Sequence, residues 1–268
     1  MFAPAAAPLL TLIEGFSPKG RMKDEIHSEF TVGEFERENR VKLEELERQR
    51  EQLTFAAYGV GVSALMGFTI FSPSAIISLP ALGEVLGKLQ EASQRYFVMQ
   101  ELIKEFEEEN IAIEMGLEPD GLRTIDFFLR FPDKEFVLLQ LRSFGNARVT
   151  YNEKREALQF RNPTGNSGAS IWKPDPLVEL SNQERWIRNH RSELLGTSSR
   201  DKRRPIAKAI VLMSETTLAE HSEHLWDTID QQNYLIIRRN GTFNVVEKDR
   251  VSAFVHSYLV SRRSSKNS

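Results

Sequence analysis

The chain has 268 residues, of which 40% are hydrophobic and 27% charged, enough apolar sequence for a sizeable buried core. It contains no cysteine, which excludes disulfides, zinc–thiolate sites, iron–sulfur clusters and a cysteine nucleophile. The net charge of -3 conceals an asymmetry, because residues 1–117 carry 11 Lys/Arg and 19 Asp/Glu whereas residues 118–268 carry 24 and 19. The basic C-terminal half permits a polyanionic partner, although a surplus of this size is also common on solvated surfaces.

The N-terminal region is charged and helical in character. Residues 1–24 lack the basic start of a secretory signal, and we expect a flexible N-terminus there. Residues 25–52 are rich in Glu, Arg and Lys, with opposite charges at helical spacing, as in Glu38 and Lys42. This pattern predicts a charged, solvated helix, or a coiled coil with a weak seam.

An uncharged stretch follows at residues 53–83. About 20 apolar residues cross a bilayer as a helix, and the stretch reaches that length before Pro73. We therefore expect a membrane segment, either a single span or a hairpin broken at Pro73. For a single span, the basic residues before the stretch place the N-terminus in the cytoplasm and the following domain outside. The hairpin keeps both ends in the cytoplasm, and we expect the following domain to face the cytoplasm. The alternative is a helix for self-association or for a protein partner, which would bind through residues 25–83.

Residues 84–260 are expected to form one α/β (α+β) domain, followed by a polar tail at 261–268. In chain order, the pattern predicts a helix at 84–115, a strand hairpin at 122–143, strands at 147–151 and 157–161, a helix between Ser181 and Gly196, a strand at 206–213, a helix at 217–229, a hairpin at 234–246 and a helix at 251–260. This order implies a mixed central sheet flanked by helices.

The hairpin at 122–143 carries three polar residues inside apolar strands. Asp126 lies in the first strand, and Gln140 and Arg142 lie in the second. Strand side chains alternate, so Gln140 and Arg142 share one face. A charged side chain buried in such a strand destabilises the fold unless an opposite charge pairs with it or it serves a function. Asp126 and Arg142 are therefore expected either to form a cross-strand ion pair or to belong to a functional site.

This succession of elements resembles the restriction-endonuclease-like fold of the PD-(D/E)xK superfamily, and in detail the nuclease-related domain (NERD). The resemblance covers roughly residues 90–250 and rests on Ile125-Asp126-Phe127, the strand from Phe136 to Ser143, Trp172, Pro176-Leu177 and Gln183. It implies magnesium-dependent cleavage of phosphodiesters. In that chemistry the strand Asp and the acid of the triplet bind the metal, the triplet Lys orients water, and a helix Glu assists.

Carried onto this chain, the resemblance implies a degenerate site. Asp126 matches the first acid, but Gln140 stands at the second acid and Arg142 at the Lys. Glu114, or Glu108, is the expected helix acid. Gln removes a negative charge from the metal site and Arg is a poor base, so we expect no cofactor, or Mg²⁺ at Asp126 if the site is active.

Two further groups of residues are candidates for binding. Basic residues that could contact phosphates, or form a solvated face, are Arg185, Arg188, Arg191, Arg200, Lys202, Arg203 and Arg204. His221 and His224 have metal-ligand spacing on a predicted helix, but no third ligand is indicated. The sequence thus predicts a membrane-tethered, catalytically degenerate nuclease-like domain that binds nucleic acid or serves as a scaffold. The alternatives are a magnesium-dependent nuclease with a variant site and a membrane-associated protein-assembly factor.

Overall fold

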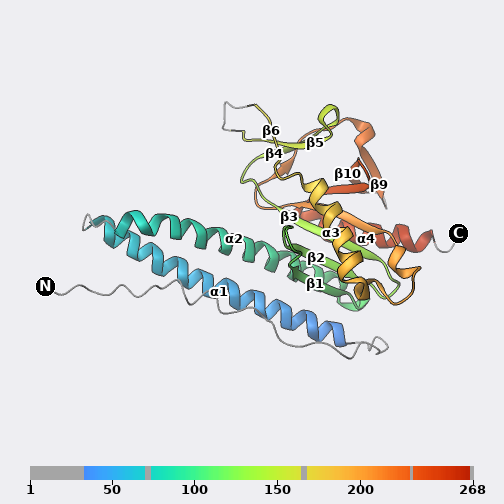
Figure 1. Ribbon diagram of the computed structural model, residues 1–268, viewed down its shortest axis with the longest axis horizontal. Helices are drawn as coiled ribbons and strands as arrows, with labels where there is room; N and C mark the ends of the chain where they lie inside the picture. Colours follow the sequence, from blue (N-terminus) through green and yellow to red (C-terminus); the bar gives the residue numbers. More distant parts are fainter. Residues whose placement is uncertain (1–32, 70–73, 164–167, 230–231, 266–268) are drawn as a thin grey trace. The chain divides into compact units, whose positions relative to one another are not determined.

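The structure is a computed structural model that describes residues 33–69, 74–163, 168–229 and 232–265, without side-chain detail at 63–69 and 74–79. These residues form an α+β fold in which a mixed sheet is flanked by helices, as predicted (Figure 1). The predicted flexible N-terminus at 1–24 lies outside the described residues, as does the start of the predicted charged helix at 25–32.

Two long helices precede the sheet. α1 (Glu34–Thr69) and α2 (Ser74–Phe106) pack against each other along much of their length (Figure 1). α1 continues from the charged residues into the uncharged stretch, and α2 continues from that stretch beyond residue 84. The predicted division at 52/53 and 83/84 therefore does not coincide with the ends of helices. Among the described residues, none of the helices combines the length and the hydropathy needed to cross a membrane.

α2 ends earlier than the predicted helix at 84–115. Phe106 is its last residue, a 3-10 turn covers Glu107–Glu109, and Asn110 adopts a left-handed backbone with φ of 52°. Strand β1 (Ala112–Leu117) follows and pairs with the next strand from Arg130 to Ile125. The end of the predicted helix is therefore wrong, since strand pairing satisfies the backbone there instead of helical hydrogen bonds.

Seven strands form the main sheet in the order β1-β2-β3-β7-β11-β10-β9. Their bounds after β1 are β2 (Ile125–Arg130), β3 (Phe136–Arg142), β7 (Ile206–Leu212), β9 (Trp226–Ile229), β10 (Gln232–Arg238) and β11 (Thr242–Glu247). β3, β7 and β11 run parallel to one another, and all other neighbours are antiparallel. The predicted turns at Pro132-Asp133 and Asn240-Gly241 are confirmed, each joining two antiparallel strands.

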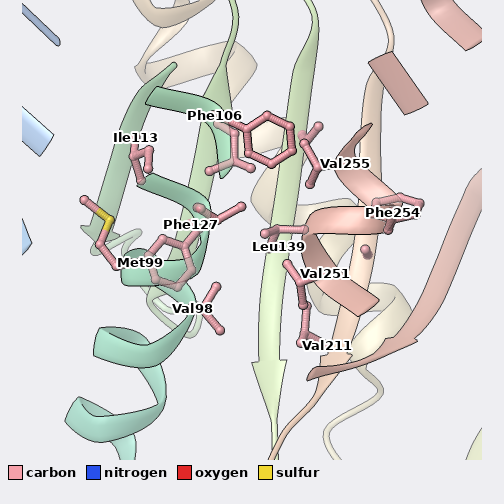
Figure 2. Close-up of a cluster of buried hydrophobic side chains, with 14 of the residues drawn as sticks. Val98, Met99, Phe106, Ile113, Phe127, Leu139, Val211, Val251, Phe254 and Val255 are labelled. Atoms are coloured by element: carbon pink, nitrogen blue, oxygen red, sulfur yellow. The ribbon is translucent and has the colours of Figure 1, made fainter. Parts of the chain in front are cut away.

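Helices cover both faces of this sheet. On one face, Leu139 of β3 belongs to a core with Met99 of α2 and Phe254 of α4 (Val251–Ser264) (Figure 2). On the other face, Leu138 belongs to a second core with Leu180 of α3 (Pro176–His190). β3 is buried along its whole length because alternate side chains enter different cores.

A smaller sheet has the strand order β6-β5-β4-β8. Its strands are β4 (Arg148–Asn152), β5 (Ala157–Arg161), β6 (Ser170–Ile171) and β8 (Thr217–Leu218). β4 and β5 lie where they were predicted. The predicted helix at 217–229 is wrong, because this segment forms β8, a 3-10 turn at Glu223–Leu225 and β9. β8 pairs with β4 and β9 with β10, so two separate sheets take up its backbone groups.

Two helix boundaries also differ from the prediction. α3 begins at Pro176, and the Asp175 side chain caps it by accepting from the Leu177 amide at 3.0 Å. Ser181, the predicted cap, lies inside the helix, where its hydroxyl donates to the Leu177 carbonyl. α4 continues to Ser264, so the predicted polar tail at 261–268 is partly helical.

Candidate functional site

The three nuclease-like positions meet near the carboxyl end of β3. Phe127 of β2 pairs with Leu139 of β3 at the end of this ladder, and Asp126 lies one residue before that pair. Gln140 and Arg142, two residues apart, share one face of β3. All three side chains are buried, with 1%, 0% and 7% of the surfaces of Asp126, Gln140 and Arg142 exposed. The Asp126 carboxylate contacts the amide of Leu141, so it lies beside the backbone between Gln140 and Arg142.

Asp126 is held by an arginine from α2. Arg95 donates to Oδ1 of Asp126 from Nε at 3.2 Å and from Nη2 at 3.1 Å. The Leu141 amide donates to Oδ2 at 2.9 Å. Burial raises the pKa of Asp126, and the nearby cations Arg95 and Arg123 only partly offset that effect. Both carboxylate oxygens are therefore engaged by donors of the protein itself.

Arg142 pairs with α3 rather than with Asp126. Its Nη2 donates to Oε2 of Glu179, which lies in the first turn of α3. Nε2 of Gln140 lies 3.5 Å from the same oxygen. Burial, together with the nearby Arg123, lowers the pKa of Arg142 to about 10, which leaves it cationic at neutral pH. The predicted cross-strand pair of Asp126 and Arg142 is wrong, since each takes a partner from a helix.

Glu114 lies on a strand, not on a helix, so its predicted place as the helix acid is wrong. It accepts from Nη2 of Arg130 at 2.8 Å and from Nζ of Lys42 at 3.5 Å. Burial raises the pKa of Glu114, but Lys42 and Arg130 together lower it below its usual value. Glu108, the other candidate, is exposed in the 3-10 turn after α2. Neither carboxylate joins Asp126.

The donor groups around Asp126 do not suit a magnesium ion. Mg²⁺ binds one or more carboxylates in octahedral geometry and keeps several waters. Here the carboxylate of Asp126 already accepts from Arg95 and Leu141, and its neighbour Gln140 is neutral. No group of three His, Asp or Glu side chains within the described part of the chain is placed to hold a metal ion.

A cleft of about 410 Å³ lies beside Arg142, between α2, the residues after β3 and the residues after β6. Its charged lining consists of Arg123, Arg142 and Lys173, opposed by Glu91, and its uncharged polar lining consists of Gln90, Gln94 and Ser143. Nε2 of Gln183 on α3 donates to the Arg123 carbonyl at 2.9 Å, which fixes the backbone that carries this arginine. The cleft therefore presents three cations and one carboxylate.

The predicted basic residues of α3 do not line this cleft. Arg188 is partly buried and binds the following loop, since Nη1 donates to the Lys202 carbonyl at 2.6 Å and Nη2 to the Arg204 carbonyl at 2.9 Å. Arg191 pairs with Glu193. Arg185 is exposed on the surface of α3. Arg188 is therefore a structural residue that anchors the following loop.

The loop that carries Arg200, Lys202, Arg203 and Arg204 lies at the other end of the main sheet. It leads into β7, whose first residue, Ile206, pairs with Phe136 at the start of β3. Arg142 ends β3, so the two places are roughly 20 Å apart at about 3.3 Å per strand residue. The structure therefore separates the predicted phosphate contacts from the nuclease-like positions.

The two histidines have different partners. Nε2 of His221 accepts from the Tyr151 amide at 2.8 Å, and its Nδ1 lies 2.7 Å from the Ala219 carbonyl. Nε2 of His224 contacts Oε2 of Glu153 at 2.8 Å. Both contacts tie the segment after β8 to the region of β4, and they do not converge on a common point.

Four residues of this site were not predicted from the sequence, namely Arg95, Arg123, Glu179 and Lys173. Arg95 lies three residues before Val98 and four before Met99, both fully buried, so a charge on the buried stripe of α2 was the available signal. Glu179 was hidden because the predicted helix began at Ser181. Lys173 follows a short strand and carried no local signal.

Comparisons of the chain with protein-family models, curated proteins and solved structures found no match. The resemblance to the nuclease-related domain therefore stays a prediction from the residues and the order of the elements.

Proposed function

We propose that the chain is a catalytically inactive nuclease-like module that binds the phosphate backbone of a nucleic acid in the cleft beside Arg142. The observation that carries this proposal is the pairing of Asp126 with Arg95 and of Arg142 with Glu179, next to a cleft lined by further cations. The order α2, β2, β3, α3, β7, with β7 parallel to β3, supports a restriction-endonuclease-like assignment.

The ion pairs argue against cleavage for a chemical reason. Hydrolysis of a phosphodiester by this type of site needs carboxylates that hold a metal and a group that orients water. The carboxylate of Asp126 is occupied by Arg95, and the guanidinium of Arg142 is occupied by Glu179. Arginine also stays protonated and is a poor base. Contact with phosphate oxygens falls instead to the other cations of the cleft lining, Arg123 and Lys173.

Binding would rest mainly on Arg123 and Lys173. The Arg123 side chain is 37% exposed, and its Nη2 lies 3.9 Å from Oε1 of Glu91. Lys173, which also lines the cleft, is exposed. Cations of this kind neutralise phosphates and release counterions, which gives binding that is independent of sequence and sensitive to salt. The amides of Gln90 and Gln94 add uncharged donors on the α2 side of the cleft.

Fluorescence anisotropy of the full chain with single-stranded DNA, duplex DNA and RNA tests this proposal. We expect affinity to fall steeply with salt, and Arg123→Glu and Lys173→Glu to weaken binding at least roughly tenfold. The matched control is Lys104→Glu, an exposed cation about 20 Å along α2 from Gln90. Equal losses in Lys104→Glu and Arg123→Glu would contradict the proposal.

A cleavage assay separates the catalytic alternative. The full chain is incubated with labelled DNA and RNA in the presence of Mg²⁺ or Mn²⁺, beside the Asp126→Ala variant. We expect no cleavage by either protein. Metal-dependent cleavage that disappears in Asp126→Ala would instead favour the variant nuclease.

We also propose that the helical hairpin of α1 and α2 holds the module at a membrane surface, lying on the bilayer. Phe55, Tyr58 and Val62 of α1 are 76%, 72% and 52% exposed, and their spacing of three and four residues places them on one helix face. Leu86 of α2 is also exposed, at 48%. Large apolar side chains exposed together on one helix face indicate an interaction surface.

Flotation of the full chain with anionic liposomes tests the membrane proposal. We expect the chain to float with the vesicles, and Phe55→Ser combined with Tyr58→Ser to reduce the bound fraction several-fold. Val178→Ser, an exposed apolar residue on α3, is the control. The proposal would be contradicted if the chain did not float. If the chain also sedimented as a dimer, and the double variant as a monomer, the same face would serve self-association instead.

A further inference from the structure

A second cavity, of about 570 Å³, lies at the end of the main sheet opposite the cleft. Its lining is Ser199, Arg200, Arg203, Arg204 and Arg262, which we call the arginine pocket. The first four residues belong to the loop before β7, and Arg262 belongs to the last turn of α4. Two distant parts of the chain thus bring four guanidinium groups to one concave surface. The sequence reasoning had singled out the loop but not Arg262.

Most of this charge has no counterion within the part of the chain that the structure describes. There, Arg200, Arg203 and Arg262 form no ion pair, and only Arg204 is paired, through Nε to Oδ1 of Asp201 at 3.2 Å. Like charges gathered around a cavity repel one another, and a bound anion converts this repulsion into attraction. The pocket is therefore electrostatically prepared for a negatively charged ligand.

Asp201, with 4% of its surface exposed, holds the loop before β7 in place through hydrogen bonds. Its Oδ2 accepts from Nζ of Lys134 at 2.7 Å, and its amide donates to Oγ of Ser198 at 3.0 Å. Gly196, at φ of 115°, passes so close that an added Cβ would lie 3.0 Å from Cβ of Asp201. Because the loop backbone is already ordered, a ligand would lose little free energy in ordering it.

We propose that the arginine pocket binds a ligand with two or more linked phosphate groups. Guanidinium groups bind phosphate oxygens through paired, charge-assisted hydrogen bonds, and several of them suit several adjacent anionic groups. The pocket volume falls in the range of about 300–1,000 Å³ that is usual for small-molecule sites. Its lining contains no aromatic residue to stack on a base, so the phosphate chain is the recognised part.

The arrangement favours a compact ligand over a nucleic-acid backbone. A polymer would need cations spread along a track, whereas here they converge on one cavity. Arg185, Arg188 and Arg191, on α3 and at its end, do not line it. The arginine pocket is separate from the cleft beside Arg142, because the two lie at opposite ends of β3.

Isothermal titration calorimetry of the full chain at constant ionic strength tests the arginine pocket. The probes are inorganic pyrophosphate, ATP and adenosine. We expect pyrophosphate and ATP to bind at one site and adenosine not to bind. Arg203→Ala and Arg262→Ala should each weaken binding roughly tenfold or more, the size expected for a lost charge-assisted hydrogen bond. Arg203→Lys should retain part of the affinity.

Arg185→Ala is the matched control, since it removes an exposed arginine outside the pocket. Circular dichroism of each variant verifies that it is folded. Equal weakening by Arg185→Ala and Arg262→Ala would overturn the proposal, as would binding of adenosine as tight as that of ATP. Displacement of pyrophosphate by an oligonucleotide, lost in Arg262→Ala, would reassign the pocket to a polymer and also overturn it. Arg123→Glu, which tests the cleft, should leave pyrophosphate binding unchanged.

Discussion

Asp126 is almost fully buried, so the cost of its charge depends on Arg95. Arg95 approaches from α2 with 17% of its side chain exposed and donates two hydrogen bonds to one carboxylate oxygen. A buried pair of this kind adds little net stability over an apolar replacement, but loss of one partner leaves the other charge unsatisfied. The pair therefore determines the position of α2 against β2 and adds little net stability.

We expect Arg95→Ala to lower the free energy of unfolding by about 3 kcal/mol, because Asp126 then loses its cation while it stays buried. Combining it with Asp126→Asn should recover part of this loss. Urea denaturation followed by circular dichroism measures both effects. Lys104→Ala on the exposed face of α2 should change stability by less than about 0.5 kcal/mol. Similar losses for Arg95→Ala and Lys104→Ala would contradict the assignment.

Asp201 provides a pH-dependent contribution to stability. The hydrogen bond from Lys134, followed by the one with Ser198, lowers the pKa of Asp201 from 3.8 to about 2. A carboxyl whose pKa is lower in the folded state stabilises that state above its unfolded pKa, and the contribution disappears as the pH falls through the folded pKa. We therefore expect wild-type stability to drop between about pH 4 and pH 2.

The matched variant for this prediction is Asp201→Asn, which keeps the size of the side chain. It should be less stable than the wild type at neutral pH and lose less stability on acidification, since it has no carboxyl at this position to protonate. Chemical denaturation at a series of pH values down to about 2 compares the two proteins. Parallel stability curves over the whole range would rule out the contribution of Asp201.

At the scale of elements, α1 covers the β1 edge of the main sheet. Nδ2 of Asn39 donates to the Ile111 carbonyl at 2.7 Å, and its Oδ1 accepts from the Ile113 amide at 3.2 Å. Nζ of Lys42 donates to the Ile113 carbonyl at 2.7 Å. These contacts use backbone groups that an open edge strand would offer to another chain. Part of the polar surface of α1 therefore binds the backbone next to and within β1.

We expect Asn39→Ala to cost about 2 kcal/mol, because it leaves two backbone groups near β1 without their partner. Hydrogen exchange of the Ile113 amide should accelerate, and aggregation through the exposed edge should increase. Mass spectrometry of deuterium uptake and light scattering measure these effects. Glu44→Ala on the exposed side of α1 is the control. Unchanged exchange at Ile113 in Asn39→Ala would show that α1 does not protect the edge.

At the scale of the whole molecule, two clusters of cations in the C-terminal half lie at opposite ends of one sheet. The cleft holds Arg123 and Lys173, and the arginine pocket holds Arg203 and Arg262. Roughly 20 Å of β3 separates them, which exceeds the Debye length of about 8 Å at physiological salt. The two places should therefore behave as independent sites.

This independence is testable with a double variant. Arg123→Glu should weaken nucleic-acid binding without affecting pyrophosphate binding, and Arg262→Ala should do the reverse. In the double variant the two effects should add within about 0.5 kcal/mol, as is usual for sites without shared contacts. Anisotropy and calorimetry on the same four proteins provide the comparison. A coupling larger than that would mean that the two ends form one extended binding surface.

Local sequence was sufficient wherever a short-range signal determines the structure. Proline-Asp and Asn-Gly turns position two hairpins, an unbroken apolar run predicts β7, and periodic apolar residues predict α4. Gln140 and Arg142 were assigned to one face of their strand because strand alternation is also a local property. These features depend on backbone preferences and side-chain periods that neighbouring residues determine.

Tertiary structure alone decided which partner each element and each charge takes. Residues 112–117 and 226–229 became strands because sheet edges were available to pair with them, which overrides helical propensity. Asp126 took Arg95 and Arg142 took Glu179, partners that lie on different helices and are distant in the sequence. A buried charge requires a nearby opposite charge, and folding alone determines which one comes within hydrogen-bond distance.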